Sequence, residues 1–155
     1  MSRLMGLVQS EVDKDKYGGL NFKPLSLIPA KRIKWYWPNM LAEGKFHVFA
    51  GDAGIGKTQI LCSIAATISK GGIFAGEKEP CEQGKVLYLA LEEQPTKVKR
   101  SFRRLGLTTD DPLKVMFGRS GKGAVEALRV VAEQEKPVMI VIDTVTRMPK
   151  KSMDI

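Results

Sequence analysis

Apolar and polar residues come in blocks along most of this chain, and the spacing within each block predicts a strand or a helix. The apolar runs at 46–50, 86–91, 113–117 and 138–142 have the length and continuity of buried strands. Between these runs, apolar residues recur every three or four positions, as on the buried face of a helix. The three predicted faces comprise Ile60, Leu61, Ile64, Ala65 and Ile68; Val98, Phe102 and Leu105; and Val125, Leu128, Val131 and Ala132.

Glycine and proline mark the ends of the predicted helices. Gly71 and Gly72 end the first helix, Pro95 begins the second and Gly106 closes it, and the third ends near Pro137. Four strands that alternate with three helices predict right-handed crossovers, and therefore an α/β fold with a mainly parallel sheet flanked by helices. In such a sheet, ligands bind beyond the carboxyl ends of the strands.

The beginning of the chain lacks this regular pattern. We therefore predict a loose N-terminal arm over 1–28 and one α/β domain over 29–155, which is an ordinary length for a single domain. Both tryptophans, Trp35 and Trp37, lie just ahead of the first predicted strand. Two roles are open for them: packing against the sheet edge, or stacking on a base or nucleotide ring.

Composition narrows the class of protein and its surroundings. The chain is 43% apolar and 27% charged, which is typical of a folded protein, and no apolar stretch is long enough for a membrane helix or a secretory signal. Cys62 and Cys81 have no metal-type spacing, so we expect reduced thiols in a cytoplasmic protein. The net charge of +8 fits either a polyanionic partner such as nucleic acid or a solvated basic surface. The same two alternatives apply to the basic residues of the second helix, Lys97, Lys99, Arg100, Arg103 and Arg104.

A glycine-rich segment at 51–58 carries the strongest chemical signal. It fits the phosphate-loop pattern of Gly, four residues and Gly-Lys-Thr, and it lies between a predicted strand and an amphipathic helix. Its glycines let backbone N–H groups turn towards phosphate oxygens, and the helix N-terminus adds its dipole. Lys57 can reach the β- and γ-phosphates, and the Thr58 hydroxyl can ligate Mg²⁺. The residues predicted to bind Mg-ATP are Gly51, Asp52, Ala53, Gly54, Ile55, Gly56, Lys57, Thr58 and Gln59.

Acidic residues follow two of the other predicted strands. Asp143 ends the apolar run at 138–142, as in a Walker B strand, and can hold the Mg²⁺ shell together with Thr58. Its alternative role is to end the strand or cap a turn. Glu92 and Glu93 follow the run at 86–91, where a carboxylate can act as the general base on the attacking water. Their alternative role is a solvated acidic pair ahead of the second helix. His47 has no evident catalytic partner, so we expect it to be structural.

Taken together, these segments resemble the RecA-type AAA ATPases related to RepA hexameric replicative helicases. The resemblance runs from about residue 33 to the end of the chain. It rests on Trp35-Tyr36-Trp37-Pro38, the phosphate loop, the strand ending in Glu92-Glu93, Arg104-Leu105-Gly106 and the strand ending in Asp143. It implies that Glu92 is the general base and that Asp143 is the Walker B acid. It also implies ATP hydrolysis coupled to the unwinding or remodelling of DNA, and a homo-oligomeric, hexameric ring.

The resemblance also implies parts that this sequence does not supply. In RecA-type folds a later strand lies between the phosphate-loop strand and the Walker B strand, and its end carries a γ-phosphate sensor. Only twelve residues follow Asp143, so we expect the N-terminal part of an ATPase domain, with open strand edges.

Two alternatives to an ATPase stay open: a nucleotide-binding module without significant turnover, and another phosphate-loop class such as a kinase or a GTPase. A GTPase is disfavoured because Asp143-Thr144-Val145-Thr146 lacks the expected glycine and the chain has no Asn-Lys-x-Asp guanine reader. A kinase is disfavoured because no arginine-rich lid follows the last predicted strand.

Overall fold

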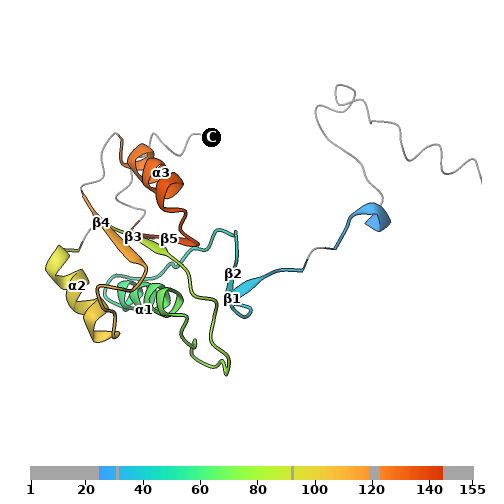
Figure 1. Cartoon of the computed structure of the whole chain (residues 1–155), viewed down its shortest axis with the longest axis horizontal. Coiled ribbons are helices and arrows are strands. Elements are labelled where there is room, and N and C mark those ends of the chain that lie inside the picture. Colours follow the sequence, from blue (N-terminus) through green and yellow to red (C-terminus); the bar gives the residue numbers. More distant parts are fainter. Residues whose placement is uncertain (1–24, 31, 92, 119–122, 145–155) are drawn as a thin grey trace, which may run out of the picture. The chain divides into compact units, whose positions relative to one another are not determined.

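The computed structural model of the chain describes residues 25–30, 32–91, 93–118 and 123–144. The chain divides into two units between Arg32 and Ile33 (Figure 1). In the first unit, the described part contains the 3-10 turn η1 (Leu25–Leu27), where the Ile28 N–H donates to the Leu25 carbonyl at 3.1 Å. Most of the predicted arm at 1–28 lies outside the described residues. None of the described helices is long and apolar enough to cross a membrane.

A parallel sheet of three strands forms the centre of the second unit. It contains β3 (Val86–Ala90), β4 (Leu113–Phe117) and β5 (Met139–Asp143) in the order β4-β3-β5. The strands predicted at 86–91, 113–117 and 138–142 are therefore confirmed, as is their parallel direction. Ala90 is paired with Phe117 on one side and with Asp143 on the other. The carboxyl ends of all three strands consequently lie at the same edge of the sheet.

Three helices cover the two faces of this sheet, so the predicted α/β class is confirmed. Helices α1 (Lys57–Lys70) and α2 (Pro95–Arg104) lie on one face, and α3 (Ala124–Glu135) lies on the other (Figure 1). Side chains alternate between the faces of a strand, so the five buried residues of β3 divide between two cores. The larger core joins Val86, Tyr88 and Ala90 to α1 and α2, and the smaller core joins Leu87 and Leu89 to Leu128 of α3.

The helix boundaries follow the predicted signals. Gly71 caps α1 in the left-handed conformation at φ 62°, and Pro95 occupies the first turn of α2. The predicted buried faces are only partly correct, because Ile60 and Val125 are 47% and 44% exposed. In α1 the core instead includes the small residues Cys62, Ala66 and Ser69, which let the helix approach the sheet closely. Hydrophobicity alone does not identify such positions.

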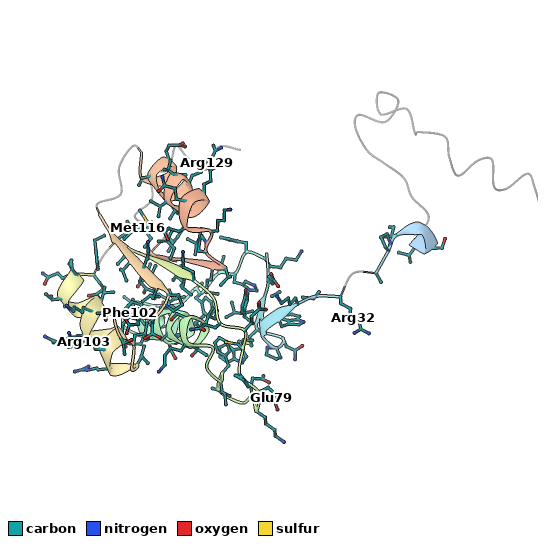
Figure 2. All side chains as sticks on the ribbon, viewed as in Figure 1. Arg32, Glu79, Phe102, Arg103, Met116 and Arg129 are labelled. Atoms are coloured by element: carbon teal, nitrogen blue, oxygen red, sulfur yellow. The ribbon has the colours of Figure 1, made fainter. Side chains whose placement is uncertain are left out.

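A short antiparallel pair precedes the phosphate loop. It is formed by β1 (Trp35–Trp37) and β2 (Leu41–Ala42). The Trp37 ring stacks on Phe74 with 4.8 Å between the ring centroids, so the structure assigns this tryptophan to packing. Trp35 is 39% exposed. Between the helices and the three-stranded sheet, side chains fill the space (Figure 2).

The strand predicted at 46–50 is not formed, and this prediction was wrong. Phe46 and Val48 are 85% and 71% exposed, and the segment has no regular structure. A strand is stable only when a neighbour pairs with its backbone groups, and none of the described strands pairs with this segment. The family resemblance places a further strand between this segment and the Walker B strand. The described residues contain no such strand. The segment is anchored through His47, whose Nε2 lies 3.2 Å from the Ala42 amide nitrogen.

Candidate functional site

The phosphate-loop residues form a turn that leads directly into α1. Gly54 and Gly56 adopt φ values of 84° and 93°, in the left-handed region that favours glycine. Gly56 is the N-cap residue of α1 and, having no side chain, makes no side-chain hydrogen bond to the first turn. The first N–H groups of a helix have no partner within the helix, and they carry the positive end of its dipole. The start of α1 can therefore accept an anion.

Lys57 extends back across the loop. Its ammonium donates hydrogen bonds to the carbonyl oxygens of Gly51 and Asp52, at 2.7 Å and 2.6 Å. The positive charge is thus held beside the backbone that would surround a phosphate. Thr58 is half-buried in the first turn of α1. The amide nitrogen of the Gln59 side chain lies 3.5 Å from Ser101 Oγ of α2, while the Gln59 backbone remains in the first turn of α1.

Asp143 ends β5 as a largely buried carboxylate, with 8% of the residue exposed. The Tyr88 hydroxyl donates to its Oδ2 atom at 2.8 Å, and the Cys62 thiol lies 3.6 Å from the Tyr88 hydroxyl oxygen. Burial raises the pKa of the Tyr88 phenol and of the Cys62 thiol, so both groups stay protonated and can donate. These contacts connect α1, β3 and β5 on one side of the sheet.

The same contacts relate Asp143 to the phosphate loop. Cys62 follows Thr58 by four positions on α1, so the two side chains lie one turn apart on the same side of the helix. A hydroxyl and a carboxylate are oxygen ligands of the kind that Mg²⁺ takes. Mg²⁺ is usually held by one or two such side chains together with substrate phosphates. The donor set therefore fits a magnesium nucleotide.

The two candidate bases differ in what the structure describes. Glu92 lies outside the described residues. Its neighbour Leu91 donates an N–H hydrogen bond of 2.8 Å to the Asp143 carbonyl oxygen, which joins the ends of β3 and β5. The Glu93 carboxylate lies 3.5 Å from the Lys97 ammonium, one turn into α2. Glu93 is thus engaged in an ion pair at the start of that helix.

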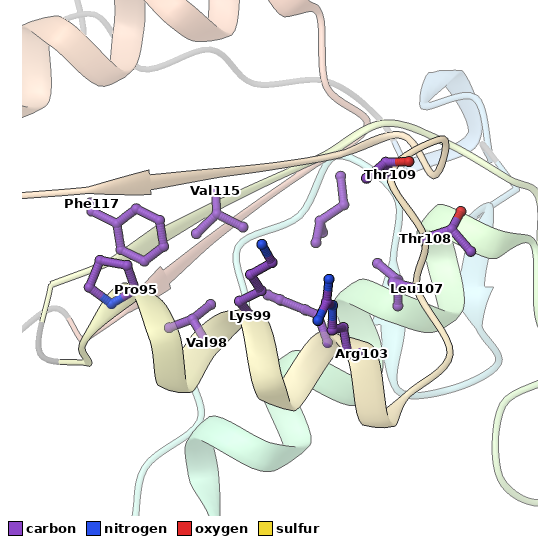
Figure 3. Close-up of a pocket in the computed structure, with 11 residues that line it drawn as sticks. Pro95, Val98, Lys99, Arg103, Leu107, Thr108, Thr109, Val115 and Phe117 are labelled. Carbon is purple, nitrogen blue, oxygen red and sulfur yellow. The ribbon is translucent and has the colours of Figure 1, made fainter.

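A groove of about 410 Å³ lies between α2 and β4, apart from the phosphate loop (Figure 3). Its lining is mostly apolar and also includes Lys99 and Arg103. The groove has no acidic residue and none of the phosphate-loop residues in its lining. The five basic residues of α2 are all exposed, as on a solvated helix face. The residues that line the groove are Pro95, Val98, Lys99, Phe102, Arg103, Leu107, Thr108, Thr109, Leu113, Val115 and Phe117.

Sequence reasoning missed two residues beside the predicted site, Tyr88 and Cys62. The sequence pattern indicates only that Tyr88 belongs to a strand and that Cys62 is a reduced thiol. A signal for each is present in the sequence. Tyr88 lies two positions before Ala90, on the same face of the predicted strand, and Cys62 lies one helical turn after Thr58.

Comparison with known proteins supports the fold. DNA repair protein RadA from Aquifex aeolicus (strain VF5) is 29% identical over 105 residues, which cover 68% of this chain and 20% of RadA. The chain thus spans about a fifth of the length of this curated relative. A family model described as an AAA domain matches residues 25–152. Because this match covers most of the chain, and because the phosphate loop and the parallel sheet agree with it, the chain belongs to the AAA domain family and has a partial RecA-like fold.

Proposed function

We propose that this chain binds Mg-ATP through residues 51–58 and forms the nucleotide-binding part of a RecA-type ATPase. The observation that carries the proposal is the start of α1. Its N-terminus has no side-chain cap, follows two left-handed glycines and lies on the same side of the sheet as the Asp143 carboxylate.

Each residue of the proposed site has a separate task. The backbone around Gly54 and Gly56 and the first turn of α1 bind the phosphate oxygens, and Lys57 adds its positive charge. Thr58 and Asp143 hold the magnesium ion, directly or through water. When bound, Mg²⁺ neutralises part of the charge on the phosphates. Glu92 is the proposed general base on water, and the ion pair between Glu93 and Lys97 supports this choice because it engages the other candidate.

The proposed activity of the whole protein is ATP hydrolysis coupled to the unwinding or remodelling of DNA, in a homo-oligomeric ring. The resemblance to RepA-related hexameric helicases supports this proposal. So does the match to RadA, which is named a DNA repair protein. The net charge of +8 suits a polyanionic partner.

Replacing Lys57 tests nucleotide binding directly. Hydrogen bonds to charged groups contribute about 1.5–3 kcal/mol each, so losing two of them from the ammonium to phosphate should weaken binding by about 100-fold or more. We expect Lys57→Ala to lose measurable binding of fluorescently labelled ATP. Lys99→Ala, which removes an exposed lysine of α2, should bind like the unchanged chain. Equal affinity of Lys57→Ala and the unchanged chain would contradict the proposal.

Turnover separates the ATPase from a binding module. We expect Glu92→Gln to retain nucleotide binding and to lower the hydrolysis rate by about 10²–10⁴-fold, the usual effect of losing a general base. Glu93→Gln is the matched control and should hydrolyse ATP normally. The reverse result would assign the base to Glu93. Addition of single-stranded DNA should raise the rate if the activity is coupled to DNA. If the unchanged chain turns over no faster than Lys57→Ala, it acts as a nucleotide-binding module.

A further inference from the structure

We propose that Tyr88 is a positioning residue for the magnesium site: its hydroxyl holds the Asp143 carboxylate in one orientation, and Cys62 of α1 holds the hydroxyl. The inference rests on the proposed binding of Mg-ATP by residues 51–58 and Asp143. It adds a specific function for a tyrosine that, by this proposal, acts on the metal site through Asp143.

The strand register brings Tyr88 to Asp143. In the β3–β5 pair, Tyr88 is opposite Val141 and Ala90 is opposite Asp143. Side chains two positions apart share a face, so Tyr88 and Asp143 are diagonal neighbours on the α1 side of the sheet. Tyr88 is fully buried, and its hydroxyl lies 2.8 Å from Asp143 Oδ2. This length is normal for a hydroxyl that donates to a carboxylate.

Two helices hold the Tyr88 ring in place. Phe102 of α2 packs edge-to-face against it, with 5.3 Å between the centroids and 87° between the planes. From α1, the Cys62 thiol lies 3.6 Å from the hydroxyl oxygen, in the geometry of a donor to that oxygen. A phenol has a single hydrogen to donate. With its oxygen accepting from Cys62, that hydrogen is directed to Asp143.

A carboxylate held through one oxygen leaves the other oxygen for the metal shell. Oδ2 of Asp143 accepts from Tyr88, and the proposal assigns Oδ1 to a magnesium ion or to its bound water. Removing a partner that orients a metal-binding group commonly lowers the metal affinity by about 10–100-fold. Since Cys62 lies one turn after Thr58, the contact also couples the carboxylate to the helix that carries the proposed Thr58 ligand.

Tyr88→Phe removes only the hydroxyl and keeps the ring. We measure the binding of fluorescently labelled ATP in EDTA and during a titration with MgCl₂. In EDTA the variant should bind like the unchanged chain, because residues 51–58 are untouched. The Mg²⁺ concentration that gives half of the maximal increase in ATP binding should rise about 10-fold or more. In an Asp143→Asn background, Tyr88→Phe should change the Mg²⁺ dependence no further.

Tyr36→Phe is the matched control, since it removes the hydroxyl of another buried tyrosine, on β1 rather than on β3. It should leave the Mg²⁺ dependence unchanged. If Tyr88→Phe does not fold, Cys62→Ala serves instead and should raise the half-maximal Mg²⁺ concentration by about 2–5-fold, as expected for one weak neutral hydrogen bond. An unchanged Mg²⁺ dependence in the folded variant overturns the role of Tyr88. Failure of the unchanged chain to bind ATP at all would instead refute the proposed function.

Discussion

The conformation of Gly56 gives the sharpest test of the phosphate loop. This residue is the N-cap of α1 and adopts φ 93° and ψ 17°. A Cβ atom built on Gly56 would meet no heavy atom within 4 Å. Gly56→Ala therefore introduces no collision, and its whole effect comes from backbone conformation.

The expected cost follows from the left-handed conformation. An L-residue in this region costs about 1–2 kcal/mol relative to its preferred conformations. Where no strain is present, replacing glycine by alanine stabilises the folded state by about 0.4–1 kcal/mol, because alanine lowers the conformational entropy of the unfolded chain. The net loss should be about 1 kcal/mol, which corresponds to a decrease of about 3–6 °C in the melting temperature of a domain of this size. An alanine that relaxes this strain turns backbone N–H groups of the first turn away from a phosphate, so ATP affinity should fall at least 10-fold.

Gly44 provides a control with a left-handed backbone at another place. It adopts φ 64°, and a Cβ atom there would also meet nothing within 4 Å. It lies in the turn after β2, outside the loop. Gly44→Ala and Gly56→Ala should therefore both lower the melting temperature, and only Gly56→Ala should weaken the binding of labelled ATP. Both properties are measurable on one preparation by thermal denaturation and fluorescence anisotropy.

Two results would refute this reasoning separately. Equal ATP affinities of Gly44→Ala and Gly56→Ala would show that the backbone of the loop is not the binding element. Melting temperatures equal to that of the unchanged chain would show that neither glycine is needed for its conformation. A loss of binding without a loss of stability would retain the site but reject the argument from backbone strain.

Two further predictions concern the sheet and its helices. The ammonium groups of Lys114 and Lys85 lower the pKa of Glu135, so this carboxylate stabilises the folded state at neutral pH and loses that effect as the pH falls through its lowered pKa. Glu135→Gln should consequently be less stable than the unchanged chain in urea denaturation at neutral pH but not in acid, and equal differences at both pH values would contradict this. A Cβ atom on Gly84 would lie 2.3 Å from Val138 Cγ2, so Gly84→Ala should cost about 1–3 kcal/mol in the same assay. The double variant Gly84→Ala/Val138→Ala should recover part of this loss, and no recovery would mean that the collision is not its cause.

The sequence correctly predicts the three strands that the sheet buries. It wrongly predicts a strand at 46–50, because that segment has no described strand to pair with. β3 is covered on both faces and reads as a continuous apolar run, so its pattern and its environment agree. The run at 46–50 has the same pattern, yet it remains irregular and exposed. An apolar run indicates that a segment can join a sheet. Whether it does so depends on a neighbouring strand, which is a property of another part of the chain.

In the candidate site, too, some features are local to the sequence and others depend on a distant part of the chain. The spacing of glycine, lysine and threonine located the loop at 51–58, because that chemistry is local to eight residues. The end of an apolar run likewise located Asp143. The contact between Tyr88 and Asp143 was not predictable in this way, since the residues are 55 positions apart and meet only through the pairing of β3 with β5.

The register of that pair decides on which side of the sheet the carboxylate lies. Asp143 faces α1 because it alternates with Ile142, which packs in the core on the α3 side. A slip of one residue would exchange the two side chains and would remove the carboxylate from the helix that begins at the phosphate loop. Two backbone hydrogen bonds hold the register at opposite ends of the strands: from the Val138 N–H to the Lys85 carbonyl at 2.9 Å, and from the Leu91 N–H to the Asp143 carbonyl at 2.8 Å. The second bond also fixes the backbone next to the proposed base, Glu92. Sheet pairing, rather than the loop alone, therefore brings the proposed metal ligand to the face of the sheet that α1 covers.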